Sequence, residues 1–395
     1  MTKGFYTLLI AQFLSALADN ALLFAAIAVL SQLNAPEWHT PMLKWVFIIA
    51  YIMLAPFVGA FADALPKGKV MFLSNGIKFF GCILAYLGVP PLYAYAIVGI
   101  GAAAYSPAKY GILTEMLPSD QLIKANAWME GTTVAAIILG PVFGAYISAS
   151  NPYYGIAVIT GLYLLAAIFN IYIPKVPKDH GIPQRSLSFL FRDFWHAFTT
   201  LWQDTQGQVA LAVTTLFWGA GATLQFVVLQ WAKEVLKMDQ QTATVLIAIL
   251  AVGIAVGSIG ASVFIKLESA VKVLPAGIIM GVLVACMIFV DTREVAAVML
   301  FSIGVLAGYF LVPLNSLLQH RGHTLLGAGH SIAVQNFNEN IGILLLLGIY
   351  TFMVHQNLPI HIIIVIFGVF VSVCMAVIYQ LYLKHSQILT QSDLP

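Results

Sequence analysis

The sequence predicts an all-α membrane protein with twelve transmembrane helices arranged in two six-helix halves. Of its 395 residues, 61% are hydrophobic and 9% are charged, whereas a soluble globular protein carries about 25% charged residues. Apolar runs that are long enough to cross a bilayer, which takes about 20 residues, recur from Phe5 to Leu383. A longer polar stretch separates the first six runs from the last six. These observations exclude a water-soluble fold.

Turn residues and clusters of charge set the limits of the apolar segments. We predict helices over residues 5–31, 42–64, 69–89, 91–113, 122–149, 153–173, 207–232, 241–266, 272–290, 294–319, 329–354 and 359–384. The first segment contains Asp19 and is not followed by a small-residue cleavage site, so we interpret it as a retained helix and not as a signal peptide. The three cysteines lie in separate apolar segments, which favours packing roles over a disulfide or a metal site.

The polar stretch divides the chain into an N-terminal half at 1–173, a linker at 174–206 and a C-terminal half at 207–395. The linker contains the amphipathic run Phe189 to Trp202, which predicts a helix lying on the cytoplasmic surface. Three landmarks of the first half recur at nearly constant spacing in the second half: Pro107 and Pro313, Glu130 and Glu339, Gly140 and Gly348. This pattern indicates a parallel duplication, which is a known transporter architecture.

The distribution of Lys and Arg predicts the orientation of the chain. With the N-terminus inside, twelve of the 18 basic residues fall on cytoplasmic segments and four on the opposite face. Because an excess of Lys and Arg marks the cytoplasmic side, we expect both termini to be cytoplasmic.

Five ionisable residues stand out because they lie well inside predicted helices: Asp19, Lys78, Lys109, Glu130 and Glu339. A charge at the centre of a membrane helix costs about 2.5–3.5 kcal/mol, so each needs a partner, water or a function. Asp19, followed by Asn20, is flanked by small residues that admit a neighbouring helix or water. It is a candidate functional group, with a structural hydrogen-bonded role as the alternative. Lys78 is expected to pair with an acid for structural reasons.

The other three charges are candidates for a central cavity. Lys109 follows Pro107, which should bend its helix, and lies near the cytoplasmic end. It either lines the cavity or extends to the interface. The duplication places Glu130 and Glu339 at similar depth, where they would bind a cation, take up a proton or join a hydrogen-bond network between helices. Asn336 is among the polar neighbours of Glu339.

A short charged turn joins the second and third helices. Asp63 ends one helix, and Lys67 and Lys69 begin the next, so that acid and base can pair when the cytoplasmic side closes and separate when it opens. This turn resembles the conserved loop of the major facilitator superfamily, with Pro66 where that family usually has glycine. We therefore predict a gating role for the three charged residues and a major facilitator fold.

Glycines on two helices indicate close packing. Gly131, Gly140 and Gly144 partly resemble the antiporter motif of the same superfamily, although one glycine of that motif is missing. We interpret them, with Gly253 and Gly257, as positions where helices approach closely.

A second resemblance covers essentially the whole chain. The segments that carry it are Gln12 to Phe24, Ala55 to Asp63, Gly99 to Leu113, Lys124 to Glu130, Asn170 to Lys175, Leu216 to Leu224 and Pro313 to Gly348. Together they resemble the bacterial lysophospholipid transporter family.

That resemblance implies a carrier that flips lysophosphatidylethanolamine and related lysolipids from the outer to the inner leaflet of a Gram-negative inner membrane. An acyltransferase acting with acyl carrier protein would then restore the missing chain. Asp19 and Lys109 match polar positions of the family's translocation path, whereas Gln225 stands where relatives carry a basic residue. The resemblance implies lysophospholipid and membrane lipids as partners, and we expect no cofactor, no nucleic acid and a monomer.

Two other functions compete with this hypothesis. A proton-coupled carrier for drugs or small metabolites would use the same fold, with Asp19, Glu130 or Glu339 as the protonation site. A membrane enzyme such as an acyltransferase is disfavoured, because the chain has no His followed four residues later by Asp, no HExxH, no Walker loop and no GxSxG. We therefore predict no catalytic residues.

Overall fold

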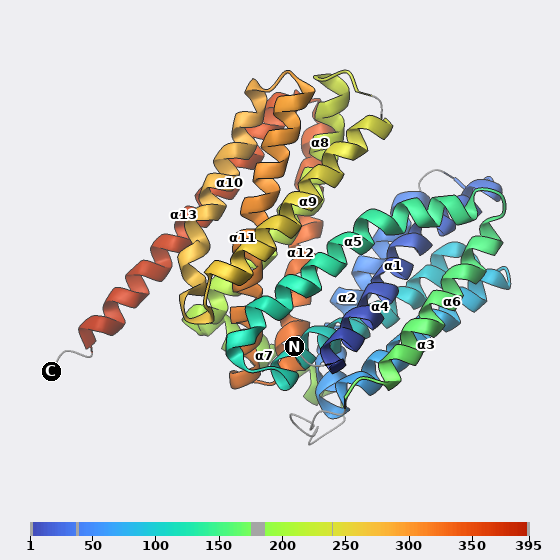
Figure 1. Ribbon diagram of the computed structural model, residues 1–395, viewed down its shortest axis with the longest axis horizontal. Coiled ribbons are helices and arrows are strands. Elements are labelled where there is room, and N and C mark those ends of the chain that lie inside the picture. The colour runs from blue at the N-terminus through green and yellow to red at the C-terminus, as the bar shows by residue number, and fades with distance from the viewer. Residues whose placement is uncertain (1–2, 37–38, 175–185, 239, 393–395) are drawn as a thin grey trace. The chain divides into compact units, whose positions relative to one another are not determined.

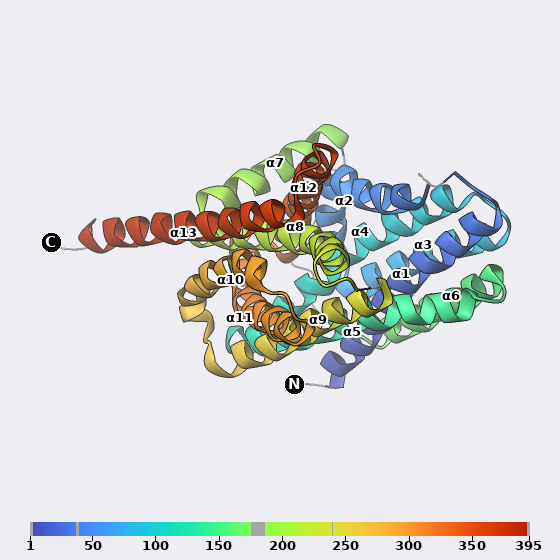
Figure 2. The same cartoon turned by 90° about the horizontal axis from the view of Figure 1, so that it is seen from above.

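The computed structural model describes residues 3–36, 39–174, 186–238 and 240–392, and every regular element within these ranges is a helix (Figures 1 and 2). The α-helices are α1 (Lys3–Gln32), α2 (His39–Ala64), α3 (Lys67–Tyr86), α4 (Pro91–Met116), α5 (Leu122–Ser148), α6 (Pro152–Ile171), α7 (Leu187–Gln203), α8 (Thr205–Glu234), α9 (Gln240–Phe264), α10 (Leu274–Cys286), α11 (Arg293–Leu325), α12 (Ala328–His355) and α13 (Ile360–Ser392). The predicted all-helical fold class is confirmed. Residues 175–185 of the predicted linker lie outside the described residues.

Each predicted transmembrane segment corresponds to a helical segment of the structure. In the described part of the chain, eleven of these segments are long and apolar enough to cross a membrane. The twelfth, α4, is 26 residues long but less apolar. It packs against α1, α2 and α3, and a helix that is surrounded by other helices can carry small and polar residues in place of lipid-facing apolar ones.

One segment differs from a simple span. The stretch predicted over 272–290 forms a 13-residue α10 flanked by two 3₁₀ segments, η2 (Leu267–Val273) and η3 (Met287–Phe289). Pro275 lies in the first turn of α10. A backbone N–H at this position would have no acceptor within the helix, so proline costs no hydrogen bond there. A third 3₁₀ segment, η1 (Ser119–Gln121), precedes α5.

The chain forms two compact units. Unit 1 comprises residues 1–118, 132–200 and 322–337, and unit 2 comprises residues 119–131, 201–321 and 338–395. Four helices are divided between the units: α5 after Gly131, α7 after Thr200, α11 after Arg321 and α12 after Phe337. The division of the sequence into halves at 173 and 207 stays a prediction.

Unit 1 is built on the packing of α3 against α4 and α6, of α2 against α4, and of α1 against α6. Buried Leu22, Val29, Val98 and Tyr163 belong to an apolar cluster of this unit. Glycine brings α5 close to α1, because a Cβ added at Gly140 or Gly144 would overlap Asn20 or Ala21. The packing role predicted for these two glycines is confirmed, whereas a Cβ at Gly131 would meet no atom within 4 Å.

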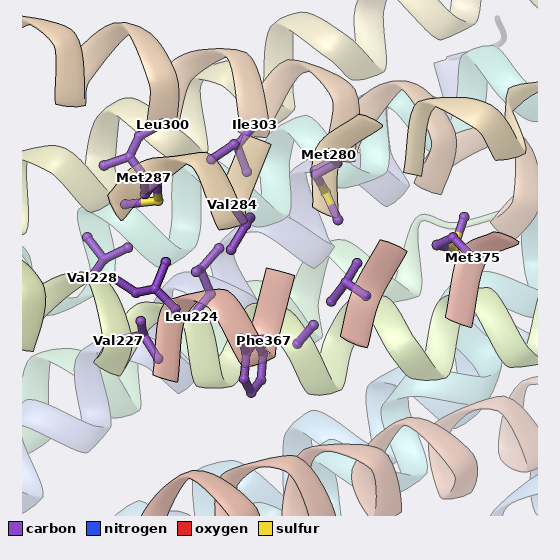
Figure 3. Close-up of a cluster of buried hydrophobic side chains, with 14 of the residues drawn as sticks. Leu224, Val227, Val228, Met280, Val284, Met287, Leu300, Ile303, Phe367 and Met375 are labelled. Carbon is purple, nitrogen blue, oxygen red and sulfur yellow. The ribbon is translucent and has the colours of Figure 1, made fainter. Parts of the chain in front are cut away.

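Unit 2 has an apolar core made by α8, α10, α11 and α13. Figure 3 shows Leu224 and Val228 of α8 facing Val284 of α10 and Phe367 of α13. Trp231 is completely buried in the same cluster. Helices α9 and α11 touch backbone to backbone, because a Cβ at Gly257 would overlap the Val305 carbonyl oxygen. The close approach predicted there is confirmed.

The amphipathic run of the linker forms helix α7. Its buried side chains Phe194, Ala197 and Leu201 recur at a spacing that places them on one face. Within unit 1, Phe194 packs edge-on against Phe337 of α12, with ring centroids 5.4 Å apart. Phe191 packs in the same way against Phe57 of α2 at 5.3 Å. The structure therefore docks α7 on α2 and on the first part of α12.

Candidate functional site

Asp19 is the acceptor at the centre of a polar cluster within unit 1. Its Oδ2 accepts a hydrogen bond from Lys78 Nζ on α3 at 2.8 Å, and its Oδ1 accepts one from the Tyr163 hydroxyl on α6 at 2.7 Å. The side chain of Lys78 is 1% exposed and that of Asp19 is 22% exposed. The pair therefore buries its cation and leaves part of its carboxylate open.

Lys78 has further partners that allow a buried ammonium group. Its Nζ donates to Ser15 Oγ at 3.0 Å, and Ser15 Oγ donates to Asn75 Oδ1 at 2.8 Å. The same nitrogen lies over the ring of Tyr105 at 4.8 Å, which is the geometry of a cation–π contact. The expected pairing of Lys78 with an acid is confirmed.

Asn20 and Lys109 make different contacts. Asn20 Nδ2 donates to the Ala16 carbonyl oxygen of its own helix at 2.9 Å. Lys109 is half-buried on α4, with its Nζ 4.2 Å from the ring centroid of Tyr110. It follows Tyr105 by one helical turn, so the two side chains share a face of α4. Lys109 therefore lies on the α4 face that covers Lys78.

Glu130 lies in unit 2, where it is 2% exposed. It accepts a hydrogen bond from Asn315 Nδ2 on α11 at 3.3 Å. Nearby, Asn126 and Gln319 exchange two hydrogen bonds, at 2.9 Å and 2.8 Å. The first turns of α5 are thus bound to α11 by buried amides, the helix-to-helix arrangement considered as an alternative for Glu130.

The remaining predicted binding residues fall at three separate places. Gln225 is exposed on α8. Asn336 belongs to unit 1, and its Nδ2 donates to Ser106 Oγ of α4 at 2.9 Å. Glu339 is 8% exposed on the part of α12 that belongs to unit 2. A substrate role for these residues stays a prediction.

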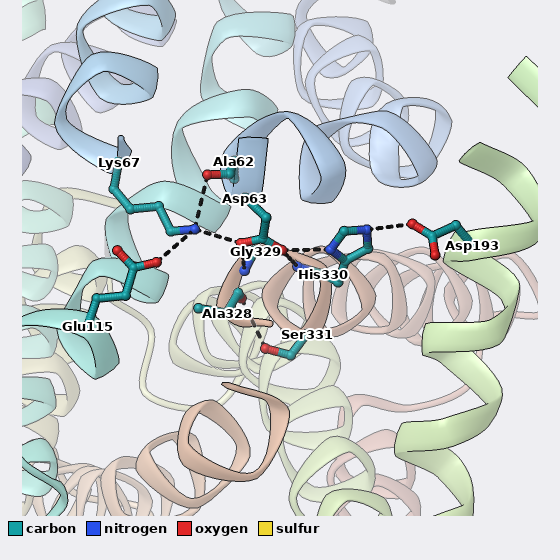
Figure 4. A network of polar contacts seen from close by, with 9 residues as sticks. All are labelled: Ala62, Asp63, Lys67, Glu115, Asp193, Ala328, Gly329, His330 and Ser331. Carbon is teal, nitrogen blue, oxygen red and sulfur yellow. Dashed lines mark hydrogen bonds and ion pairs between the residues drawn. The ribbon is translucent and has the colours of Figure 1, made fainter. Parts of the chain in front are cut away.

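The charged turn between α2 and α3 forms a buried network within unit 1 (Figure 4). Lys67 Nζ lies 2.6 Å from Asp63 Oδ1 and 3.0 Å from Glu115 Oε1 of α4. It also donates to the Ala62 carbonyl oxygen at 3.0 Å. Lys69 is exposed, and no ion pair of Lys69 is found among the described residues. Of the two bases predicted to pair, Lys67 does so.

Asp63 also holds the N-terminus of α12. Its Oδ1 accepts from the Gly329 backbone N–H at 2.7 Å, and its Oδ2 accepts from the His330 backbone N–H at 3.0 Å. These N–H groups belong to the first helical turn, which has no intrahelical acceptor for them and which favours a negative charge. A Cβ at Gly329 would contact Asp63, so glycine permits this close approach.

His330 extends the network to α7. Its Nδ1 lies 2.6 Å from Asp63 Oδ2, and its Nε2 lies 2.8 Å from Asp193 Oδ2 (Figure 4). Both contacts are hydrogen bonds when the imidazole carries two protons, because an ionised carboxylate only accepts. The hydrogen bond to His330 lowers the pKa of Asp193 from its ordinary value. We call the set Asp63, Lys67, Glu115, His330 and Asp193 the latch.

Several residues of these clusters were not predicted. Each of them forms a hydrogen bond or an ion pair with a charged residue on a segment that is distant in the sequence: Tyr163, Glu115, Asp193 and His330. The sequence offers one partial signal, because His330 follows Gly327 and Gly329 at a helix start. Nothing local points to the partners of that histidine.

Comparisons with known proteins place these sites in a family context. The family model described as Major Facilitator Superfamily matches residues 8–346. A protein of Serratia proteamaculans named lysophospholipid transporter LplT is 44% identical over 355 residues, which cover 90% of this chain and 89% of that protein. An Escherichia coli O157:H7 protein of the same name is 42% identical over 385 residues, covering 97% of both.

Solved structures resemble the chain in fold. A bacterial homologue of the iron transporter ferroportin in an outward-facing state gives a TM-score of 0.75 at 14% identity, covering 97% of this chain and 100% of that one. The transporter FucP in its outward conformation gives a TM-score of 0.77 at 15% identity, covering 96% and 98%. At such low identity these similarities concern the fold alone.

Proposed function

This chain belongs to the Major Facilitator Superfamily and within it to the lysophospholipid transporter family, and we propose that it transports lysophospholipids across the membrane. The observation that carries the proposal is the 42–44% identity to transporters of that name over about nine-tenths or more of the chain. Movement from the outer to the inner leaflet by alternating access, followed by re-acylation, is part of the proposal.

The carboxylate of Asp19 is suited to bind the ammonium of an ethanolamine headgroup. Each of its oxygens accepts one described hydrogen bond, and an ionised carboxylate has about four acceptor sites. Its exposed fraction of 22% leaves room for a further donor. Charge-assisted hydrogen bonds are about twice as strong as neutral ones, which supports Asp19 as the headgroup contact.

We assign the lysolipid phosphate to Lys109. Lys109 is positively charged and lies one helical turn after Tyr105, on the same face of α4. At Gln225 the chain has an amide where the family resemblance led us to expect a base, so contact there would be an uncharged hydrogen bond. We include Asn20, Glu130, Asn336 and Glu339 in the proposed translocation path as polar groups along the way.

We propose that the latch governs opening of the cytoplasmic side. Asp63 holds the start of α12 through two backbone N–H groups and one imidazole nitrogen. Any motion that separates α12 from α2 must break all three contacts. Lys67 and Glu115 then remain to neutralise each other, which lowers the cost of opening. Lys69 is proposed to assist from the exposed side of α3.

The remaining features of the proposal are a monomer in the Gram-negative inner membrane with both termini cytoplasmic, functionally coupled to an acyltransferase. The excess of basic residues on one face supports this orientation. A proton-coupled carrier of drugs or small metabolites is not favoured, because the relatives at 42–44% identity are named lysophospholipid transporters.

Uptake of labelled lysophosphatidylethanolamine tests the proposal. Spheroplasts that lack their own transporter would receive the intact chain, Asp19→Ala or Lys109→Ala, with membrane insertion and folding checked for each. We expect uptake by the intact chain and its loss in both variants. Uptake no higher than that of the empty vector, with folded protein present, would refute lysophospholipid transport. Repeating the assay with the proton gradient collapsed separates facilitated flipping from coupled transport.

A further inference from the structure

A groove at one end of unit 1 has polar groups that none of the contacts described above uses. It has a volume of about 500 Å³ and lies between the turn after α2, the first turns of α3 and the end of α6. Helices α3 and α6 pack against each other (Figures 1 and 2). The groove therefore opens where two membrane-spanning helices reach the membrane surface.

Asn170 supplies a buried amide to this groove. It is one of the residues that line the groove, and it is 2% exposed. Both its Oδ1 and its Nδ2 lack a hydrogen-bond partner among the described residues. A buried amide without partners has lost its hydrogen bonds to water without replacement, so a ligand that accepts from its NH₂ group would recover part of that free energy.

The start of α3 supplies further donors. Its N-cap is Pro66, which makes no side-chain capping bond. Lys69 and Val70 donate their backbone N–H groups to the Pro66 carbonyl oxygen, while the N–H of Gly68, which lines the groove, lies in the first turn, where no intrahelical acceptor exists. Such a helix terminus favours an anion, and phosphate in particular.

Lys69 is the charged residue of the groove lining. The residue is exposed in the first turn of α3 and lines the groove together with Asn170. No carboxylate lines the described groove. The groove can therefore neutralise a phosphate, but it offers no partner to the ammonium of a zwitterionic headgroup.

The other lining residues are apolar, and two of them are open to the surroundings. Phe72 is 40% exposed and Ile171 is 63% exposed. A free phosphate ion gains no binding free energy from apolar side chains, whereas an acyl chain buries apolar surface against them. Basic pockets between membrane helices on the cytoplasmic side recognise anionic lipid headgroups in this way.

We propose that this groove binds a phospholipid of net negative charge from the cytoplasmic leaflet. The phosphate lies against the α3 N-terminus, Lys69 and Asn170, and an acyl chain lies along Phe72 and Ile171. The choice of leaflet rests on the orientation given under the proposed function. Binding itself does not depend on transport, so its test is separate from the uptake assay.

Native mass spectrometry of the full-length protein in detergent, titrated with phosphatidylglycerol or phosphatidylethanolamine, measures the binding. We expect one phosphatidylglycerol retained by the intact protein, and about tenfold weaker retention in Lys69→Gln and in Asn170→Leu, as for loss of a hydrogen bond to a charged group. Lys124→Gln, which removes an exposed lysine from the start of α5, is the matched control and should retain the lipid.

A second readout separates a ligand site from a structural role. Without lipid, Asn170→Leu should unfold at the same or a higher temperature, because it removes an unpaired buried amide. Equal retention of phosphatidylglycerol by the intact protein and both variants would overturn the proposal. So would equal retention of phosphatidylethanolamine by the intact protein, or displacement of the lipid by millimolar inorganic phosphate.

Discussion

Asp19 of α1 and Lys78 of α3 form an ion pair, with Lys78 Nζ 2.8 Å from Asp19 Oδ2, in which the lysine is buried and the carboxylate is partly open. The two groups therefore differ in what happens when the partner is removed. An unpaired Lys78 has no access to water, whereas an unpaired Asp19 keeps the Tyr163 hydroxyl and some solvent. The stability of unit 1 should depend on them unequally.

Asp19→Asn should destabilise the protein by about 3–5 kcal/mol, because it leaves a buried ammonium group without its counter-ion. Lys78→Leu should cost less. The double variant should be more stable than Asp19→Asn alone, since it removes both charges. Thermal unfolding followed by intrinsic fluorescence in detergent gives the ranking. If Asp19→Asn unfolds at the temperature of the intact protein, the pair does not support the fold.

Asp63→Asn should release the start of α12. Ser331 is completely buried beside the latch, so a cysteine there, in a chain whose three native cysteines are replaced by alanine, reports the release. Loss of charged hydrogen bonds worth about 1.5–3 kcal/mol each should raise the rate of maleimide labelling of Ser331→Cys about tenfold or more.

The control for this labelling is Asp120→Asn, which neutralises an exposed acid in η1. It should leave the labelling rate of Ser331→Cys unchanged. Equal rates with and without Asp63→Asn would mean that Asp63 does not hold α12.

The contact of Asp193 with His330 should make the docking of α7 depend on pH. The pKa of Asp193 lies below its ordinary value of 3.8 because of the hydrogen bond to His330. Its contribution is therefore present above pH 3.8 and is lost as the pH falls through the lowered pKa of the folded state. Since the side chain is 34% exposed, we expect about 1 kcal/mol or less at neutral pH.

Asp193→Asn should remove that contribution at neutral pH. Hydrogen exchange of the peptide covering α7, compared between the intact protein and this variant at one pH, measures the change as faster exchange. Gln203, exposed at the end of α7, provides the control variant Gln203→Ala. Unchanged exchange in Asp193→Asn would show that Phe191 and Phe194 dock α7 without the carboxylate.

Gly257→Ala should separate α9 from α11. The added Cβ would overlap the backbone of Val305, and overpacking of this kind costs about 1–3 kcal/mol. Gly260→Ala on the same helix is the control, because its Cβ would meet Tyr309 only at 3.9 Å and alanine favours a helix by about 1 kcal/mol over glycine. A lower unfolding temperature is expected for the first variant alone. A similar loss in both would contradict the assignment of the effect to the overlap with Val305.

The helices and their limits were predictable because they depend on short segments of sequence. An apolar run of about 20 residues has no stable state in a bilayer other than a helix or a closed barrel. The predicted segments accordingly match helical segments of the structure, including α4, whose lower hydropathy reflects its place among α1, α2 and α3. The start of α10 was less accurate, because a 3₁₀ segment precedes Pro275.

Membership of a transporter family was also readable from the sequence, since Asp63, Lys67 and the long matching segments are local patterns. The sequence further showed that Asp19 and Lys78 each needed a partner, because a charge in a membrane helix is costly. It did not pair them with each other.

Those pairings were decided by the tertiary structure alone. Asp19 and Lys78 are 59 residues apart, and Asp63 and His330 are 267 apart. The free energy of a buried charge depends on which groups lie within a few ångströms of it, and helix packing determines that distance. The sequence by itself therefore determined the class, the helices and the need for partners, while the packed structure decided the Asp19–Lys78 pair, the latch and the groove beside Asn170.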